Sequence, residues 1–356
     1  MKTVTVLGTR PEIIKLSPLI DKLGKKNNSI IFTGQHYDYD MGLQFIDQLG
    51  IRKPDYSLIL NQSKPAFQIG EIMVKLSKIF EKIQPDTVIV QGDTNTVLAA
   101  SMASLKSGIP ISHVESGLRS FDWRMPEEHN RIVTDHISEF LFAPTKISKN
   151  NLLKECVHGK IFVTGNTVID SINNFVDISK KKSKLEIEID NYVLMTLHRA
   201  ENVDDKTILT SIINGILNSK ADFIFPIHPR TLKRLKQFNL YKKLVNSENI
   251  LLLNSVGYFE MLQLMKKCTF IFTDSGGLQE EATSPKLRKK VLVARKTTDR
   301  PESVEAGLSE IVGTRQGKIT STINKTLDNP KLSSKKTPYG KGNTSLQITK
   351  ILKKHF

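Results

Sequence analysis

The stretch TVIVQGDTNTVLAASMASLK, residues 87–106, decides the fold. Its first four residues are almost entirely apolar, as expected of a strand that is buried on both faces of a sheet. Gly92 then allows a tight turn, and the residues from Thr94 onward predict a helix. A buried strand that leads directly into a helix is the repeating unit of a parallel sheet covered by helices.

The same alternation of short β-branched runs and helical stretches continues on both sides of this segment. A charged segment with few large apolar groups, residues 179–190, interrupts it and is typical of a linker. Before the linker, the pattern predicts strands at 4–7, 30–33, 87–90, 109–114, 140–143 and 161–163, with helices at 66–83, 94–106, 127–137 and from 167 onward. After the linker, it predicts strands at 192–196, 223–226, 250–253, 270–273 and 291–294, with helices at 206–218, 258–267, 278–283, 319–327 and 345–354.

The sequence therefore predicts an α/β protein with two domains, each a doubly wound parallel sheet. The length of 356 residues agrees, because single domains usually contain about 100–200 residues. We expect a first Rossmann-like domain at residues 1–178, a second at 191–338 and a final helix within 344–356. Ligands of such sheets bind beyond the carboxyl ends of the strands, and two such domains facing each other would form a central cleft.

The composition excludes several classes of protein. The net charge is +16, but the lysines are scattered and no basic stripe is interleaved with aromatic residues. We therefore expect a solvated basic surface that favours anionic substrates, with neither nucleic acid nor a membrane as partner. The two cysteines, Cys156 and Cys268, have no metal-ligand spacing and are expected to be core thiols. Without a signal peptide or an apolar run of about 18 residues, a cytoplasmic location is expected.

The loop after the first predicted strand, GTRPE at residues 8–12, joins a glycine turn to a helix start. Free N–H groups and the helix dipole favour anions at such a position. Arg10 offers a forked contact to phosphate, and Lys15 lies one turn further along. An ordinary turn with a surface arginine explains the motif equally well. The loop lacks the GxGxxG pattern, which disfavours a nicotinamide dinucleotide.

Three acidic residues follow strands or open a helix in the first half. Asp93 comes after the apolar strand at 87–90, Glu115 comes after the next strand, and Glu127 opens a helix together with Glu128. Asp93 alone could be a helix N-cap, and the two glutamates alone could complement a helix dipole. Carboxylates that converge on one edge shift each other's pKa values apart, which suits paired acid and base roles.

In the second half, His198 and His228 each follow a strand, where a histidine can exchange protons near neutral pH. The sequence Ser275-Gly276-Gly277 follows another strand at a helix start, where backbone N–H groups would bind a phosphate. Glu281, in the same helix, could accept bonds from both ribose hydroxyls of a nucleotide. The segment at 295–302 adds further cations, among them Arg300.

Taken together, these motifs resemble the non-hydrolysing UDP-N-acetylglucosamine 2-epimerases. The resemblance runs from residue 1 to about residue 312, and its specificity comes from the order of the motifs. It implies a GT-B fold, a homodimer and a C-terminal helix that packs back on the first domain. The motifs are GTRPE at 8–12, GDT at 92–94, HVESGLR at 113–119, PEE at 126–128, His198-Arg199, TDSGGLQEE at 273–281 and TTDRPE at 297–302.

The resemblance also implies a mechanism and a substrate, a UDP-N-acetylhexosamine. UDP is eliminated across C1 and C2 of the sugar to give a 2-acetamidoglucal, and it adds back after C2 is protonated on the opposite face. No metal or redox cofactor is needed, and the product usually enters cell-envelope polysaccharide synthesis. By resemblance, the catalytic residues are Asp93, Glu115, Glu127 and His198, and the substrate-binding residues are Arg10, Lys15, His228, Ser275, Gly276, Gly277, Glu281 and Arg300.

Two segments depart from the family pattern. The link at 282–290 is about two residues longer than in many relatives, which affects a loop expected near the uracil. Tyr37 and Asp38 replace other polar groups of members that have a substrate-activation site, so activation by substrate is not carried over. The alternative functions are a hydrolysing epimerase that releases N-acetylmannosamine and UDP, a GT-B glycosyltransferase and a basic nucleic-acid-binding protein.

Overall fold

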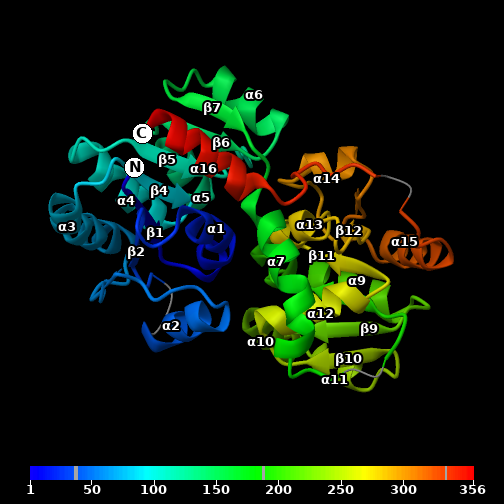
Figure 1. Cartoon of the computed structure of the whole chain (residues 1–356). Helices are drawn as coiled ribbons and strands as arrows, with labels where there is room; N and C mark the ends of the chain where they lie inside the picture. The colour runs from blue at the N-terminus through cyan, green and yellow to red at the C-terminus, as the bar shows by residue number, and fades with distance from the viewer. Residues whose placement is uncertain (36–38, 187–188, 333–334) are drawn as a thin grey trace. The chain divides into compact units, whose positions relative to one another are not determined.

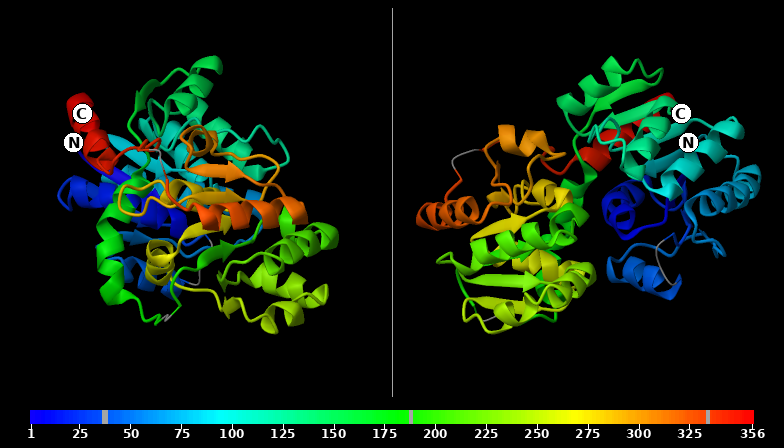
Figure 2. Two further views of the ribbon diagram at one scale, coloured as in Figure 1. Left: turned by 90° about the vertical axis from the view of Figure 1, so that its right-hand side faces the viewer. Right: turned by 180° about the vertical axis from the view of Figure 1, so that it is seen from behind.

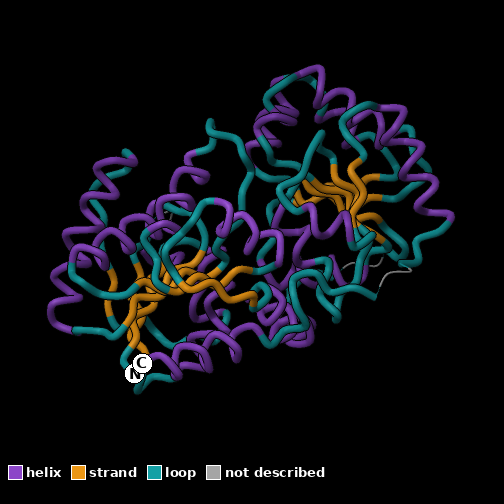
Figure 3. Tube along the Cα trace, turned by 90° about the horizontal axis from the view of Figure 1, so that it is seen from above, coloured by secondary structure: helices purple, strands orange, loops and turns teal. Residues whose placement is uncertain are grey.

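The structure is a computed structural model of the chain and describes residues 1–35, 39–186, 189–332 and 335–356 (Figure 1). The chain divides into two compact units. The first contains Met1–Ser171 and Tyr339–Phe356, and the second contains Ile172–Pro338. In each unit the strands form a middle layer and helices cover both of its faces (Figure 3). The predicted fold class, α/β with two doubly wound parallel sheets, is confirmed.

The sheet of the first unit is parallel throughout and has the order β3-β2-β1-β4-β5-β6-β7. The order reverses between β1 and β4, the position at which open α/β sheets bind ligands. Its strands are β1 (Thr3–Leu7), β2 (Asn28–Phe32), β3 (Tyr56–Ser57), β4 (Thr87–Gln91), β5 (Ile111–Val114), β6 (Phe140–Ala143) and β7 (Lys160–Val163).

The helices of the first unit pack against this sheet. They are α1 (Arg10–Leu23), α2 (Tyr39–Gln48), α3 (Pro65–Ile83), α4 (Asn95–Lys106), α5 (Pro126–His136), α6 (Lys146–Lys154) and α16 (Thr344–His355). Helix α7 (Thr167–Lys182) begins in the first unit and continues into the second.

The sheet of the second unit has the parallel order β10-β9-β8-β11-β12-β13, which reverses between β8 and β11. Its strands are β8 (Val193–Thr196), β9 (Phe223–Pro226), β10 (Ile250–Leu253), β11 (Phe270–Thr273), β12 (Val291–Val293) and β13 (Ser309–Ile311). Its helices are α8 (Ala200–Val203), α9 (Lys206–Leu217), α10 (Pro229–Gln237), α11 (Tyr241–Val245), α12 (Tyr258–Lys267), α13 (Gly276–Glu281), α14 (Pro301–Glu305) and α15 (Gln316–Asp328).

The core of the first unit lies between its sheet and the helices. Val88 and Val90 of β4 are fully buried, and so is Ile72 of α3. All five residues of β4 are buried, as its apolar sequence predicts for a central strand. Polar loops follow these buried strands. Because the strands are parallel, the side chains of these loops lie at one edge of the sheet.

The C-terminal helix α16 belongs to the first unit and packs on α1 (Figure 2). Asp170 of α7 accepts hydrogen bonds from the backbone N–H groups of Thr344 and Ser345, at 3.1 and 2.9 Å. This carboxylate satisfies two of the N–H groups that a helix start leaves without intrahelical partners. The backbone N–H of Asn166 also donates to the carbonyl of Tyr339, at 2.8 Å.

Some local expectations were wrong. The segment expected to be a linker begins as helix, since α7 continues through Lys182, where cations complement the helix C-terminus. Cys268 is buried as expected, but Cys156 is exposed in the turn after α6.

The departures from the family pattern at Tyr37 and Asp38 lie outside the described residues. Within the described ranges, no helix is long and apolar enough to cross a bilayer.

The turn after β1 should tolerate no side chain larger than that of glycine at Gly8. A Cβ atom there would lie under 3.0 Å from the hydroxyl oxygens of both Thr33 and Thr96, which are hydrogen-bonded to each other at 2.7 Å. We predict that Gly8→Ala lowers the free energy of unfolding by about 1–3 kcal/mol, the usual cost of overpacking. Urea denaturation followed by circular dichroism measures this change.

Gly70 provides the matched control, because it lies within α3 and a Cβ there would meet open space. Gly70→Ala should raise the free energy of unfolding by roughly 0.5–1 kcal/mol through reduced chain entropy and better helix propensity. Wild-type stability of Gly8→Ala would contradict the packing argument.

Candidate active site

The loops after β1 and β4 are joined by one buried carboxylate, Glu12. Its Oε2 accepts hydrogen bonds from the backbone N–H groups of Gly8 and Thr9, and its Oε1 accepts one from the Thr94 hydroxyl. Thr9 is the N-cap of α1, so Glu12 occupies the third position of a capping box. The helix start that the sequence places after β1 is thus locked to the loop that carries Asp93.

Burial raises the pKa of the Glu12 carboxyl to about 7, although hydrogen bonds from Thr94, Gly8 and Thr9 oppose the shift. Either protonation state fits this position, because the Thr94 hydroxyl can donate to the carboxylate or accept from the carboxyl.

Glu115 lies in the turn after β5 and has a positive φ of 70°, which is unusual for a residue other than glycine. Its side chain is buried and its two oxygens accept bonds from the Lys15 ammonium, at 2.8 and 2.6 Å. Gln91 and Asn166 also donate amide hydrogens to Oε2, at 3.0 and 3.3 Å. The structure therefore brings together Lys15 and Glu115, which are separated by 100 residues in the sequence.

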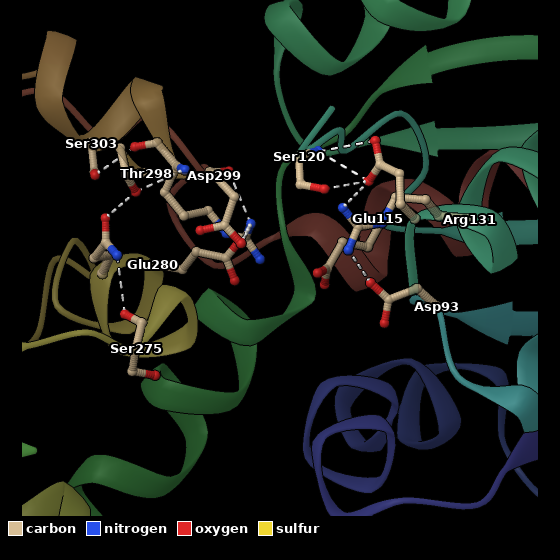
Figure 4. A network of polar contacts seen from close by, with 12 residues as sticks. Asp93, Glu115, Ser120, Arg131, Ser275, Glu280, Thr298, Asp299 and Ser303 are labelled. Carbon is tan, nitrogen blue, oxygen red and sulfur yellow. Dashed lines mark hydrogen bonds and ion pairs between the residues drawn. The ribbon is translucent and has the colours of Figure 1, made fainter. Parts of the chain in front are cut away.

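Asp93 lies at the end of the neighbouring strand and pairs with a different cation, Arg131 of α5 (Figure 4). The side-chain amide of Asn130 donates to the Asp93 carbonyl at 2.9 Å and holds the loop from the same helix. The helix after this loop is capped by Thr94, whose hydroxyl accepts from the backbone N–H of Val97. The reading of Asp93 as an N-cap is therefore wrong, and its carboxylate remains partly exposed.

The two adjacent glutamates of α5 have different environments. Glu128 is buried and accepts hydrogen bonds from the backbone N–H groups of Ser120 and Phe121, while Arg131 binds its Oε2 at 2.8 Å. Glu127 is exposed in the first turn of the helix. Within the described residues, Glu127 makes no hydrogen bond or ion pair with Asp93 or Glu115. Glu128 thus stabilises the loop before α5 by accepting these backbone hydrogen bonds.

Arg10 is the first residue of α1, and its guanidinium lies 4.8 Å from the centre of the Phe45 ring. This cation–π contact orients the side chain without neutralising its charge. Arg10 is partly exposed, so the loop after β1 presents a cation beside the N–H groups of a helix start.

In the second unit, a buried acid again joins the loops at the point where the strand order reverses. Asp274, after β11, accepts hydrogen bonds from the backbone N–H groups of His198 and Arg199, after β8, at 3.1 and 3.0 Å. It also binds the side chains of His198 and Asn202. Burial acts to raise the pKa of Asp274, but the bonds with His198, Arg199 and Asn202 outweigh burial and hold that pKa below its usual range.

His228 lies near His198, with ring centroids 5.8 Å apart. It is the N-cap of α10, and its Nδ1 accepts a hydrogen bond from the backbone N–H of Arg230 at 3.2 Å. Partial burial and the nearby charges of His198 and Arg230 lower the pKa of His228. A neutral ring with Nδ1 as acceptor carries its proton on Nε2, so His228 presents a neutral N–H donor.

The Ser275-Gly276-Gly277 segment forms the start of α13. The Ser275 hydroxyl accepts from the backbone N–H of Leu278 at 3.4 Å and so caps the helix. The N–H groups of Gly276 and Gly277 occupy the first turn, where a helix has no carbonyl partners of its own. Glu281 is partly buried at the last position of this short helix.

Arg300 belongs to a dense charge cluster beside α13 (Figure 4). Its guanidinium is buried and pairs with the carboxylates of Glu280, at 2.5 Å, and Asp299, at 3.1 Å. Burial acts to raise the pKa of Asp299, but the charges of Arg300, Arg199 and Arg295 outweigh it and hold that pKa well below its usual range. Arg300 therefore organises this cluster, and Arg199 is its more exposed cation.

A protein-family model described as UDP-N-acetylglucosamine 2-epimerase matches residues 21–353. The chain belongs to the UDP-N-acetylglucosamine 2-epimerase family. The resemblance inferred from the motifs is therefore confirmed, and the GT-B fold and the isomerase class of this family apply to the chain.

Relatives in the epimerase family match over their whole length. UDP-N-acetylglucosamine 2-epimerase of Methanocaldococcus jannaschii is 45% identical, covering 99% of both chains. Its crystal structure in complex with UDP-GlcNAc and UDP has a TM-score of 0.86 and 44% identity, covering 99% of this chain and 100% of that chain. The Neisseria meningitidis enzyme bound to UDP-GlcNAc has a TM-score of 0.87 and 36% identity with the same coverage. UDP-2,3-diacetamido-2,3-dideoxy-D-glucuronate 2-epimerase of Pseudomonas aeruginosa is 36% identical over 99% of this chain and 100% of its own length.

Sequence reasoning missed several residues that organise the epimerase loops. Glu12 lies within the GTRPE motif, and Arg131 lies after the PEE motif on the same helix. Only the structure shows that Arg131 pairs with Asp93 and that Glu12 joins two loops. Asn166 gave no sequence indication, because it precedes a helix far from Glu115 in the chain. In the described part of the chain, no group of three or more His, Cys, Asp or Glu side chains could hold a metal ion.

The raised pKa of Glu12 predicts a pH-dependent stability. Between the ordinary pKa of 4.5 and the folded value of about 7, the folded state binds more protons than the unfolded state. The contribution of Glu12 to the free energy of unfolding is thus greatest below about pH 4.5 and declines as the pH rises to about 7. Glu12→Gln removes this titration, so wild type should lose about 3 kcal/mol relative to the variant across this window.

Thermal unfolding of both proteins at several pH values measures the effect, as the difference between their midpoints. A difference that stays constant from about pH 5 to about pH 8 would contradict the assigned environment of Glu12.

Proposed function

We propose that this chain is a non-hydrolysing UDP-N-acetylglucosamine 2-epimerase, which interconverts UDP-GlcNAc and UDP-ManNAc. The observation that carries the proposal is the pair of carboxylates, Asp93 and Glu115, on adjacent loops at the end of one sheet. Each has its own cation, Arg131 for Asp93 and Lys15 for Glu115. Membership in the epimerase family supports the same chemistry.

The proposed reaction moves one proton and one leaving group. A base removes the C2 proton, the C2–H electron pair forms the C1–C2 double bond, and the C1–O bond breaks to release UDP. An acid then protonates C2 on the opposite face while UDP returns to C1. Two titratable groups that act on opposite faces meet this requirement, and we assign Asp93 and Glu115 to this role. Elimination and re-addition leave no net oxidation, so the reaction needs no redox cofactor.

Glu127 and His198 complete the proposed catalytic set. Glu127 is an exposed carboxylate on the helix that also carries Arg131 and Asn130, both of which bind Asp93. Nδ1 of His198 lies 3.2 Å from Oδ1 of Asp274, which leaves Nε2 available to a ligand. A histidine oriented by a carboxylate is suited to stabilising the charge that develops on a departing diphosphate.

The second unit supplies the proposed UDP-binding groups. Backbone N–H groups of Gly276 and Gly277 and the Ser275 side chain would bind phosphate oxygens, and Glu281 would bind the ribose hydroxyls. His228 offers a neutral N–H donor. Arg300 acts by holding Asp299 and Glu280 beside α13. In the first unit, Arg10 would contact the diphosphate, and Lys15 would contact the substrate beside Glu115.

The sugar itself has a second candidate. The Pseudomonas aeruginosa relative carries in its name a UDP-diacetamido-glucuronate, which shares the acetamido group at C2. The same acid and base groups would serve either sugar, because the reacting atoms are identical. A hydrolysing epimerase and a GT-B glycosyltransferase differ in products, so product analysis separates them.

We propose a cytoplasmic location, where thiols such as the exposed one of Cys156 stay reduced. UDP-ManNAc formed there would enter cell-envelope polysaccharide synthesis, the usual destination in the family.

The proposed reaction predicts that solvent deuterium is incorporated at C2 of the sugar. Incubation with UDP-N-acetylglucosamine in deuterium oxide should give a mixture with UDP-N-acetylmannosamine, carry deuterium at C2 and release little UDP, as monitored by proton NMR. Stoichiometric UDP with N-acetylmannosamine would instead identify a hydrolysing enzyme, and turnover only with an added acceptor would identify a glycosyltransferase.

The same assay on Asp93→Asn and Glu115→Gln should show kcat lowered by roughly 10²–10⁴, the loss expected for a general acid or base. UDP affinity, measured by calorimetry, should remain near normal, because neither Asp93 nor Glu115 is among the proposed UDP-binding groups. Normal turnover of either variant would remove that residue from the catalytic set.

The proposed homodimer is supported by an apolar face of α3. Phe67 and Val74 are separated by two helical turns and are 63% and 59% exposed, so they form one stripe. We expect Phe67→Lys combined with Val74→Lys to convert a dimer into a folded monomer, as measured by light scattering during gel filtration. Val245→Lys, at an exposed position of the second unit, is the control and should leave the dimer intact. A monomeric wild type, or a dimeric double variant, would contradict this interface.

A further inference from the structure

His113 of β5 is fully buried, and both of its ring nitrogens contact oxygen atoms. Nδ1 lies 2.7 Å from Oδ1 of Asp135, and Nε2 lies 2.9 Å from the backbone carbonyl oxygen of Gly92. The carbonyl oxygen can only accept a hydrogen bond. Asp135 also acts as an acceptor, because the Arg119 guanidinium, 2.8 Å from its other oxygen, favours the ionised carboxylate, and that oxygen also accepts from the backbone N–H of Gly117 at 3.0 Å.

A neutral imidazole has one donor and one acceptor nitrogen, so it can satisfy only one of these two oxygens. Both bonds form together only if both nitrogens carry hydrogen, which makes the ring an imidazolium. The surrounding charges balance it. Asp135 faces His113 and Arg119, and Arg119 pairs in turn with Glu155 at 2.7 and 2.6 Å. Two buried cations and two carboxylates therefore form a neutral network, as buried charges require.

This network reaches both of the loops that carry the proposed acid and base. Gly92 immediately precedes Asp93, so the bond from His113 holds the peptide that leads into that carboxylate. Gly117 lies two residues after Glu115, and both residues have positive φ, 79° and 70°. A left-handed residue other than glycine is strained and persists only where its surroundings hold it.

We propose that His113 is a positioning residue whose doubly protonated ring links the carbonyl of Gly92 to Asp135 and thereby holds the loops of Asp93 and Glu115 in register. The assignment of these loops to catalysis rests on the proposed function. The charge state of the ring rests on geometry alone. A histidine that only fills the core would need neither the second proton nor an effect on turnover.

The first test is nitrogen-15 NMR of wild-type protein labelled at histidine. Both ring nitrogens of His113 should give protonated, imidazolium-type signals. A signal from an unprotonated ring nitrogen of His113 at neutral pH would overturn the proposal. This measurement requires neither turnover nor a variant, so it is decisive even if the proposed function fails.

The second test compares two variants that each keep one donor. In His113→Gln, the nitrogen of the introduced side-chain amide occupies the place of Nε2 and can still reach the carbonyl of Gly92. In His113→Asn, the shorter amide replaces only Nδ1. We expect His113→Asn to lower kcat about 100-fold, the usual effect of a displacement near 1 Å, with KM changed little. The kcat of His113→Gln should be at least about tenfold higher than that of His113→Asn.

His136→Gln is the matched control, because His136 is exposed on the helix that carries Asp135 and its Nδ1 bonds to the carbonyl of Ile132 within that helix. It should behave as wild type. Wild-type kcat in folded His113→Asn, or equal losses in the Asn and Gln variants, would overturn the positioning role. Absence of turnover in wild type would instead overturn the proposed function.

Discussion

A buried carboxylate at the point where the strand order reverses is the interaction on which each unit depends. In the first unit, Glu12 joins the loops after β1 and β4, and in the second unit, Asp274 joins the loops after β8 and β11. Parallel strands deliver their loops to one edge of a sheet, but they leave the ends of these loops with unsatisfied N–H groups. A carboxylate that accepts several of these N–H groups converts two neighbouring loops into one rigid platform.

Charge pairing explains how the platform of the first unit carries functional acids without being destabilised. Asp93 and Glu115 each contact a separate cation, and the His113 network below them is neutral in total. Removing one member of such a pair leaves a buried charge without a partner. The resulting loss in the free energy of unfolding is larger than the net stabilisation that the intact pair provides. The geometry required for proton transfer and the stability of the loops therefore depend on the same contacts.

Much of the candidate site was predictable because it follows strand ends. Asp93, Glu115, His198 and Ser275 come directly after apolar runs, and such runs are readable as strands buried on both faces. The helices α6 and α10 were missed, since they are short and mostly polar. Glu127 and Glu128 show the limit of this reasoning, because adjacent positions on a helix point in different directions. One is buried against Arg131 and the other is exposed.

The sequence by itself determined the α/β class, the two sheets and the family, because these depend on local periodicity and on the order of motifs along the chain. The partners of each functional group were decided only by the tertiary structure. Lys15 with Glu115, Arg131 with Asp93, and His113 with Gly92 and Asp135 are pairs separated by about 20–100 residues. Such pairs form because folding brings their strands side by side, and no pattern within a single segment specifies which distant side chain will meet a buried charge.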